Sequence, residues 1–172
     1  MPEEADPKGA EGLSGRLRMG KVEERLRAAG LEVPEVAKPL AAYVPALLDG
    51  KDVFTSGQLP LVQGKLEYTG HLGAELDVEQ GQAAARRCAL NVLGAIRSVA
   101  GDLDRVAQVL RVTVFVASAP GFTAQPQVAN GASELLGTAF GDQGKHTRSA
   151  VGVAELPLGA PVEVEVWVRL KD

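Results

Sequence analysis

The chain has 172 residues, a formal net charge of −4, 45% hydrophobic residues and a single cysteine. This size fits one globular domain, which can bury roughly 70% of its unfolded surface without a disulfide or a structural metal. One cysteine excludes an intramolecular disulfide framework and a four-cysteine zinc site. The acidic balance and the 4% aromatic content argue against nucleic-acid binding, which usually requires a basic patch or stacking side chains.

The N-terminal region carries no recognisable targeting signal. Residues 1–18 mix glycine, proline and charge without periodicity, and this composition predicts a disordered tail. A secretory signal would begin with basic residues and continue into an apolar run. No apolar run approaches the ~18 residues of a membrane span. We therefore expect a cytoplasmic protein that does not enter a membrane.

A short helix and a hairpin are expected next. The apolar spacing of Lys21–Gly30 predicts a helix, so residues 19–39 are expected to form an N-terminal helical extension of a main domain at 40–172. The apolar runs Leu40–Leu48 and Val53–Gly57 flank an Asp-Gly pair, which is typical of hairpin turns.

Two main helices are expected after this hairpin. The longer covers Val78–Ala100, and its buried stripe contains Cys88, which is expected to be a small core side chain rather than a reactive thiol. Asp77 and Gln80 occupy the positions of a capping box at its start. The second helix covers Gln125–Phe140 and is weakened by two glycines.

Three strands complete the pattern. In Val106–Ala117 the even-numbered positions from Leu110 onward are apolar, whereas Arg111 lies among mixed residues on the other face. Thr147–Ala154 and Val162–Leu170 are expected to pair as a terminal hairpin. This order of elements predicts an α+β two-layer domain, with a mixed sheet and the two main helices on one face.

The other face of the predicted sheet combines Arg111, Trp167 and two glutamates with apolar residues. It is too apolar to face solvent and too polar to belong to the hydrophobic core of a single chain, a combination that usually marks an interface. Copies of the chain packed around an axis would cover this face, so a closed homo-oligomer is expected.

The residues best suited to chemistry lie near the C-terminus. Arg148 precedes the small residues Ser149 and Ala150, which leave backbone N–H groups accessible beside a guanidinium that suits a planar carboxylate. Glu163 lies on the mixed face and can act as an acid or base. In the expected hairpin these two residues lie roughly 20 Å apart at ~3.3 Å per residue, so a shared site would lie between subunits. A surface ion pair for Arg148 and a solvated Glu163 remain open.

No nucleophile elbow, phosphate-binding loop or metal-binding motif is recognisable in the sequence. His71 and His146 are the only histidines, and they are expected to be surface loop residues. Neither a metal nor a cofactor is therefore expected.

Four segments occur in an order that is specific. They are Phe54–Pro60 (FTSGQLP), Val112–Val116 (VTVFV), VANGASELL around Asn130, and Arg148–Glu165 (RSAVGVAELPLGAPVEVE). Together they resemble the Rid family, which is also called YjgF/YER057c/UK114 or endoribonuclease L-PSP. The resemblance spans roughly Leu40 to Leu170 and covers nearly the whole expected core.

The resemblance implies a chorismate-mutase-like fold and a homotrimer, with sheets packed around the trimer axis and sites in the clefts between subunits. It implies a cofactor-free deaminase that hydrolyses enamine or imine intermediates, such as 2-aminoacrylate, to 2-keto acids and ammonia. The family's carboxylate-binding arginine falls on Arg148, and its acidic residue near the attacking water falls on Glu163. The substrate-binding positions are expected to be Tyr43, Ser56, Gly57, Asn130, Ser149 and Ala150.

Two departures near the arginine indicate a divergent subgroup with an altered pocket. Ala150 stands where the best-known deaminases of the family have cysteine, and Gly152 stands where they have glutamate. The leading hypothesis is an enamine or imine deaminase, and the alternative is a non-catalytic module that binds a small carboxylate or keto acid. The family's older name suggests a ribonuclease or translation inhibitor, against which the acidic balance argues.

Overall fold

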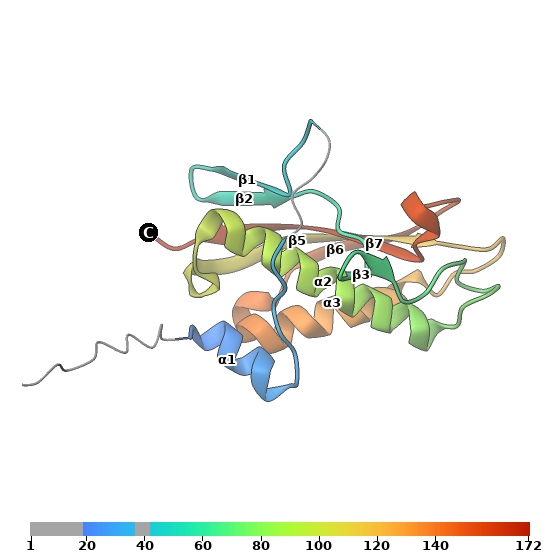
Figure 1. Ribbon diagram of the computed structural model, residues 1–172, viewed down its shortest axis with the longest axis horizontal. Coiled ribbons are helices and arrows are strands. Elements are labelled where there is room, and N and C mark those ends of the chain that lie inside the picture. The colour runs from blue at the N-terminus through green and yellow to red at the C-terminus, as the bar shows by residue number, and fades with distance from the viewer. Residues whose placement is uncertain (1–18, 37–41) are drawn as a thin grey trace, which may run out of the picture.

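The computed structural model describes residues 19–36 and 42–172, which form an α+β fold (Figure 1). Short 3₁₀ turns lie at Leu103–Arg105, Gly141–Gly144 and Pro157–Gly159. The helices and strands, in chain order, are α1 (Lys21–Ala28), β1 (Ala46–Asp49), β2 (Asp52–Thr55), β3 (Leu61–Val62), β4 (Lys65–Leu66), α2 (Val78–Ala100), β5 (Val106–Ala117), α3 (Gln125–Phe140), β6 (Thr147–Val153) and β7 (Val162–Leu170).

Within the described residues, five strands form the main sheet in the order β1-β2-β7-β5-β6, and β3 and β4 form a separate two-stranded sheet. Strands β5 and β6 are parallel, whereas the other neighbours are antiparallel, which confirms the expected mixed sheet. Figure 1 shows α2 and α3 side by side beneath one face of the sheet. Burial of alternate valines on that face drives the two layers together.

The expected terminal hairpin is wrong, because β5 lies between β6 and β7. Helix α3 connects β5 to β6 as a crossover, and this connection makes the two strands parallel neighbours. The segment Ala154–Pro161 then passes the end of β5, where the N–H of Ala117 donates to the carbonyl of Pro161. Arg148 therefore lies opposite Val112 rather than opposite a residue of β7.

The alternation expected for β5 holds from Val112 to Val116 but is wrong at Leu110. Register shifts against β7 occur between Val106 and Gln108 and between Val109 and Arg111. Such an irregularity changes which residues face inward, so Val109 is buried in the core and Leu110 is partly exposed.

Helix α2 matches its predicted bounds and is closed at its start by the expected capping box. The side chain of Asp77 accepts from the N–H of Gln80, and the side chain of Gln80 accepts from the N–H of Asp77. Cys88 is fully buried, and burial raises the pKa of its thiol, as expected for a structural cysteine. Gly131 on α3 lies so close to the carbonyl of Gln82 that a Cβ would overlap it, which explains a glycine inside a helix.

The N-terminal helix α1 packs against the helical layer through Val22 and Leu26. The N–H groups of Lys21 and Val22 both donate to the carboxylate of Asp104, which satisfies two donors at the helix start. The predicted tail at 1–18 lies outside the described residues.

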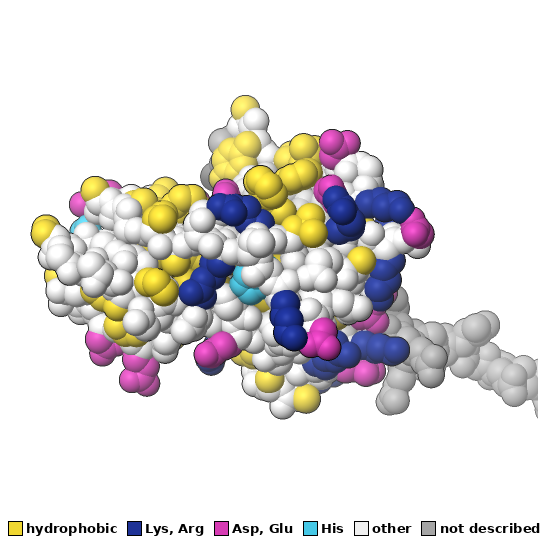
Figure 2. All heavy atoms as spheres, turned by 180° about the vertical axis from the view of Figure 1, so that it is seen from behind, with side chains coloured by type: hydrophobic (Ala, Val, Ile, Leu, Met, Phe, Trp, Pro, Cys, Tyr) yellow, Lys and Arg dark blue, Asp and Glu magenta, His cyan; other side chains and the backbone are white. Residues whose placement is uncertain are grey.

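The Asp-Gly pair belongs to the predicted hairpin, in which β1 pairs antiparallel with β2. The first strand begins at Ala46, later than expected, and residues 40–41 lie outside the described ranges. Figure 2 shows hydrophobic side chains gathered at the top of the molecule, where this hairpin and the segment before it lie. The large exposed apolar residues there are Tyr43, Val44, Leu47 and Leu48.

Within the described ranges, no helix is both long and apolar enough to cross a membrane.

Candidate functional site

Arg148 extends from β6 toward α3, and hydrogen bonds to this helix fix its guanidinium. Its Nη1 donates to Oδ1 of Asn130 at 2.9 Å and to Oγ of Ser133 at 3.1 Å, and its Nη2 donates to the carbonyl of Pro126 at 3.3 Å. Its Nε–H has no partner among the described residues. Hydrogen bonds from Nη1 and Nη2 therefore hold the guanidinium, and its Nε–H remains available to a ligand.

His146 and Arg148 both form a hydrogen bond with the hydroxyl group of Ser133. Its Nδ1 lies 2.6 Å from the carbonyl of Gly144, and its Nε2 lies 2.9 Å from Oγ of Ser133. A carbonyl can only accept, so Nδ1 carries a proton, and in the neutral ring Nε2 accepts from the Ser133 hydroxyl. The serine oxygen in turn accepts from Arg148, so the three side chains form one chain of hydrogen bonds.

Sequence reasoning missed Ser133 and interpreted His146 as a surface loop residue, whereas the ring is half-buried in this cluster. A spacing signal could have found both. Ser133 follows Asn130 by three positions on one helix face, and His146 precedes Arg148 by two positions along an extended segment. Such residues point to the same side of their element.

Glu163 is half-buried and lies beside the turn that follows β2. A Cβ at Gly57 would overlap its carboxylate, so the glycine lets the carboxylate lie close to the backbone of this turn. Burial raises the pKa of Glu163, and the nearby charge of Glu165 raises it further. A carboxyl group with a raised pKa is well suited to moving protons near neutral pH.

The chain before β1 lies against the same turn. The hydroxyl of Ser56 donates to the carbonyl of Val44 at 2.6 Å, and the N–H of Ser56 donates to the carbonyl of Pro45. Tyr43 directly precedes these two partners of Ser56 in the sequence, but its side chain is 59% exposed in the single subunit. Ser56, Gly57 and Glu163 thus share one region, and Tyr43 lies at its border.

Ser149 and Ala150 follow Arg148 along β6 and face opposite sides of the sheet. Oγ of Ser149 accepts from Nη2 of Arg111 at 2.9 Å, on the side away from the helices. Ala150 is partly buried and packs against the core. The backbone of β6 at these residues is engaged with β5 on one side, and β6 is the edge strand on the other.

One subunit does not bring Arg148 and Glu163 together. Arg148 lies opposite Val112 on β5, whereas Glu163 lies opposite Phe115. This register separates them by three residues along the strands and by two strand spacings, or ~14 Å between backbones. Arg148 points toward α3, and Glu163 belongs to the other face of the sheet. The ~20 Å from the hairpin register was therefore wrong, because the strands are not paired.

The described residues contain no group of three or more histidine, cysteine, aspartate or glutamate side chains that could hold a metal ion. Their candidate chemistry is instead that of a guanidinium, hydroxyl groups, a carboxyl group and backbone N–H groups. Such groups bind carboxylates and transfer protons.

The comparisons with known proteins identify the family. Residues 23–170 match the sequence model described as "YjgF/chorismate_mutase-like, putative endoribonuclease". The chain therefore belongs to the YjgF family, as its sequence motifs indicated.

Similar proteins include Protein TCP17 of Trypanosoma cruzi, which is 47% identical over 154 residues, covering 89% of this chain and 96% of the relative. The crystal structure of Atu1372 from Agrobacterium tumefaciens, a protein of unknown function, is 40% identical with a TM-score of 0.82, covering 87% of this chain and 92% of that chain. The crystal structure of E. coli TdcF with bound serine is 25% identical with a TM-score of 0.58, covering 80% and 94% respectively.

Proposed function

We propose that the protein is a homotrimer that hydrolyses small 2-imino acids, such as the tautomer of 2-aminoacrylate, to 2-keto acids and ammonia. The observation that carries this proposal is the separation of Arg148 from Glu163 across the sheet. Arg148 is held by hydrogen bonds to α3, Glu163 lies against Gly57, and neither has the other within reach in one subunit. A site that uses both must combine the Arg148 edge of one subunit with the Glu163 face of another.

The outer face of the sheet supports an assembly of this kind. Trp167 is 40% exposed there and stacks edge-on against Phe54 at a ring distance of 5.3 Å. Large aromatic side chains on an exposed sheet face are typical of surfaces that pack against another chain. In the proposed trimer, this face contacts the neighbouring subunit, and Glu163 lies at the interface between the two.

The proposed reaction uses the groups already described. The Nε edge of Arg148 binds the substrate carboxylate, with Asn130 and Ser133 holding the guanidinium from behind. Glu163 takes a proton from water as the water oxygen bonds to the imine carbon, and passes that proton to the nitrogen. Glu163 then transfers the remaining proton of the new hydroxyl group to the nitrogen. The C–N bond breaks, ammonia leaves, and a carbonyl group forms. No cofactor is needed, because positioning and proton transfer suffice for a reaction that also proceeds in water.

A binding module without turnover is the second candidate. The structurally similar TdcF of E. coli has serine bound in its crystal structure, and serine carries the same carboxylate that Arg148 is proposed to hold. Ala150 and Gly152 give this chain a different set of side chains beside the arginine from that of the best-known deaminases. Such a pocket can bind a small carboxylate without reacting with it.

The first test measures keto-acid release when a serine dehydratase supplies 2-aminoacrylate. Wild-type protein is expected to accelerate the release, and Arg148→Ala to abolish the acceleration. Arg86→Ala is the matched control, since Arg86 is an exposed arginine on α2. Thermal stabilisation by pyruvate without any acceleration would favour the binding module. RNA cleavage that survives Arg148→Ala would instead favour a ribonuclease.

The second test asks whether two subunits share the site. Arg148→Ala and Glu163→Gln are each expected to be inactive, whereas coexpressed mixed oligomers regain activity in about a quarter of their sites by random assembly. Mixed oligomers as inactive as either variant alone would contradict a shared site, and active Arg148→Ala would end the proposed role of the arginine.

A further inference from the structure

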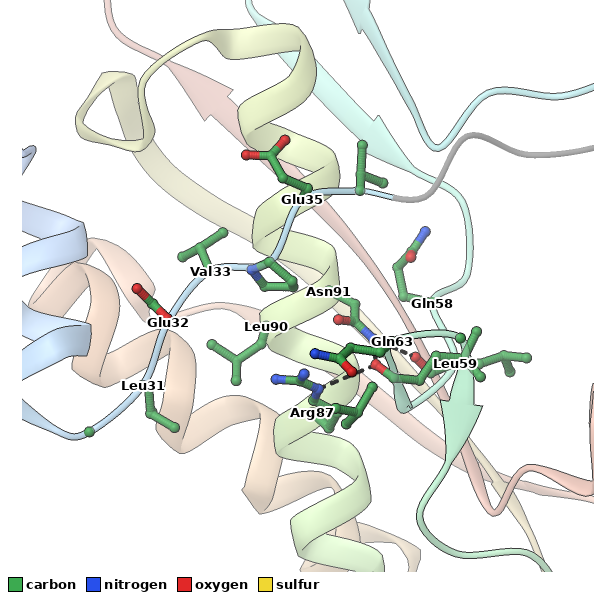
Figure 3. A pocket seen from close by; sticks show the side chains of 16 residues that line it. Leu31, Glu32, Val33, Glu35, Gln58, Leu59, Gln63, Arg87, Leu90 and Asn91 are labelled. Atoms are coloured by element: carbon green, nitrogen blue, oxygen red, sulfur yellow. Dashed lines mark hydrogen bonds between the residues drawn. The ribbon is translucent and has the colours of Figure 1, made fainter. Parts of the chain in front are cut away.

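A groove of about 650 Å³ lies on the helical side of the molecule, apart from Arg148 and Glu163 (Figure 3). One wall is the segment Gly30–Val36 after α1, the other is the β3–β4 hairpin with the residues before it, and α2 forms the floor. Pockets for small molecules usually have volumes of roughly 300–1,000 Å³. The groove is therefore large enough for a ligand.

Both walls are fixed to α2, so the groove is already formed without a ligand. The Nδ2 of Asn91 donates to the carbonyls of Leu59 at 2.8 Å and Leu61 at 3.0 Å, which holds the hairpin side. On the other side, the carbonyl of Pro34 lies so close to Gly94 that a Cβ there would overlap it. The first wall thus rests directly on the helix backbone.

The described residues that line this groove are mainly aliphatic and include one cationic side chain, that of Arg87. Its apolar side chains are Leu31, Val33, Pro34, Val36, Leu59, Leu61, Val62 and Leu90. Arg87 reaches into it from α2, and its Nε donates to the carbonyl of Leu61 at 3.3 Å. Among the described residues, its Nη1 and Nη2 form no hydrogen bond and no ion pair with a carboxylate. A half-buried guanidinium without a counter-ion favours an anionic ligand.

Nearby charges limit the kind of anion. Figure 3 shows the carboxyl groups of Glu32 and Glu35 at the rim, pointing away from Arg87. Glu35 pairs with Arg97 at 3.3 Å, and Arg97 also pairs with Glu23 at 2.7 Å. The positive charge of Arg97 is therefore already balanced by carboxylates. Two acidic side chains at the rim disfavour a multiply charged ligand such as a nucleotide. A ligand with a single negative charge, placed at Arg87, therefore suits the groove best.

We propose that this groove is a second ligand site, which binds an amphipathic monocarboxylate with its carboxylate on Arg87 and its aliphatic chain against the two walls. The site is independent of the proposed imine hydrolysis, since it shares neither Arg148 nor Glu163 with it. The N-terminal segment supplies one complete wall, so the site depends on the residues that precede the hairpin.

The test is calorimetric titration of the full chain with octanoate, in the wild type and in Arg148→Ala. The Arg148→Ala background removes any contribution from a carboxylate at the proposed active site. Octanoate is expected to bind both proteins equally, and Arg87→Gln is expected to weaken binding by about tenfold or more, since a charge-assisted hydrogen bond is lost. Octan-1-ol, which has the same chain without the charge, is expected to bind as weakly as octanoate binds Arg87→Gln.

Arg86→Gln is the matched control, because Arg86 adjoins Arg87 in the sequence but does not line the groove. It is expected to bind octanoate like the wild type, and Arg87→Lys to keep part of the affinity. Three results would overturn the proposal: no binding of octanoate, equal binding to Arg87→Gln, or a loss that follows Arg148→Ala instead. The last result would place the ligand at Arg148 and leave the proposed hydrolysis untouched.

Discussion

The two faces of the main sheet differ in what one chain can complete. On the helix-facing side, the valines of β5 and β7 are fully buried against α2 and α3. On the other side, the same strands carry Glu163, Glu165 and the exposed Trp167, together with Arg111 of β5. A single subunit therefore completes its core, and we propose that a neighbouring subunit covers its outer face. Stability should depend on the first face, whereas assembly and the proposed role of Glu163 should depend on the second.

The largest expected effect is on the helix-facing side. Val166→Asp places a charge in a fully buried position and should destabilise the protein by about 4 kcal/mol or more. The neighbouring substitution Trp167→Asp falls on the outer face and should leave a folded subunit that no longer assembles. Urea denaturation and light scattering measure the two effects. If Trp167→Asp unfolds the chain as Val166→Asp does, the proposed difference in role between the two faces is contradicted.

The next effect concerns the close approach of Gly57 to Glu163. Gly57→Ala should displace the carboxylate, because the new Cβ would overlap it, and should lower keto-acid release by about tenfold to a hundredfold without unfolding the protein. Gly137→Ala is the control, since its Cβ meets nothing within 4 Å on α3 and should stabilise the helix by about 1 kcal/mol. Unchanged activity in Gly57→Ala would remove Glu163 from the mechanism.

A smaller effect is expected where α3 holds the arginine. Ser133→Ala removes an acceptor from Arg148 and a donor to His146, and should raise KM about fivefold with little change in kcat. Ser133 positions the arginine and is not expected to touch the reacting atoms. Thr138→Ala, on an exposed turn of the same helix, is the control. A fall in kcat with an unchanged KM would contradict this positioning role.

The smallest effect links the loop before α2 to the end of β6. A hydrogen bond to the carbonyl of Ala154 raises the pKa of His71, and the charges of Glu155 and Glu75 add to it. The folded pKa thus lies above the unfolded value of about 6.5, so this stabilisation is complete below that pH and is lost as pH rises through the folded pKa. Melting temperatures should fall slightly more between pH 5.5 and 8 in the wild type than in His71→Gln. Parallel pH profiles would show that His71 contributes nothing.

Much of the fold could be predicted, because its signals are local. The apolar stripe and the Asp77–Gln80 capping box predict α2, since both depend on residues within a few positions of one another. The alternation in β7 predicts a strand with one buried face for the same reason. The motifs around Gly57 and Arg148 indicated the family, and the match over residues 23–170 confirmed it.

The pairing of β6 could not be predicted in the same way. A strand that follows another after a short connection can form a hairpin with it or cross to a different neighbour, and the alternation of β6 and β7 is compatible with both. The crossover through α3 placed β6 beside β5 and so moved Arg148 to the edge of the sheet. The cluster of Ser133, His146 and Arg148 was hidden for the same reason, since it joins a helix to a strand.

The sequence by itself determined the main helices and strands, most of the apolar face of the sheet and the family, because these depend on residue spacing and on short motifs. Only the tertiary structure decided that β5 lies between β6 and β7, and that Arg148 and Glu163 face away from each other. It also placed Arg87 in a groove where no carboxylate of the described residues pairs with it. Such relations depend on which strands become neighbours, and that choice is set by packing between segments that are distant along the chain.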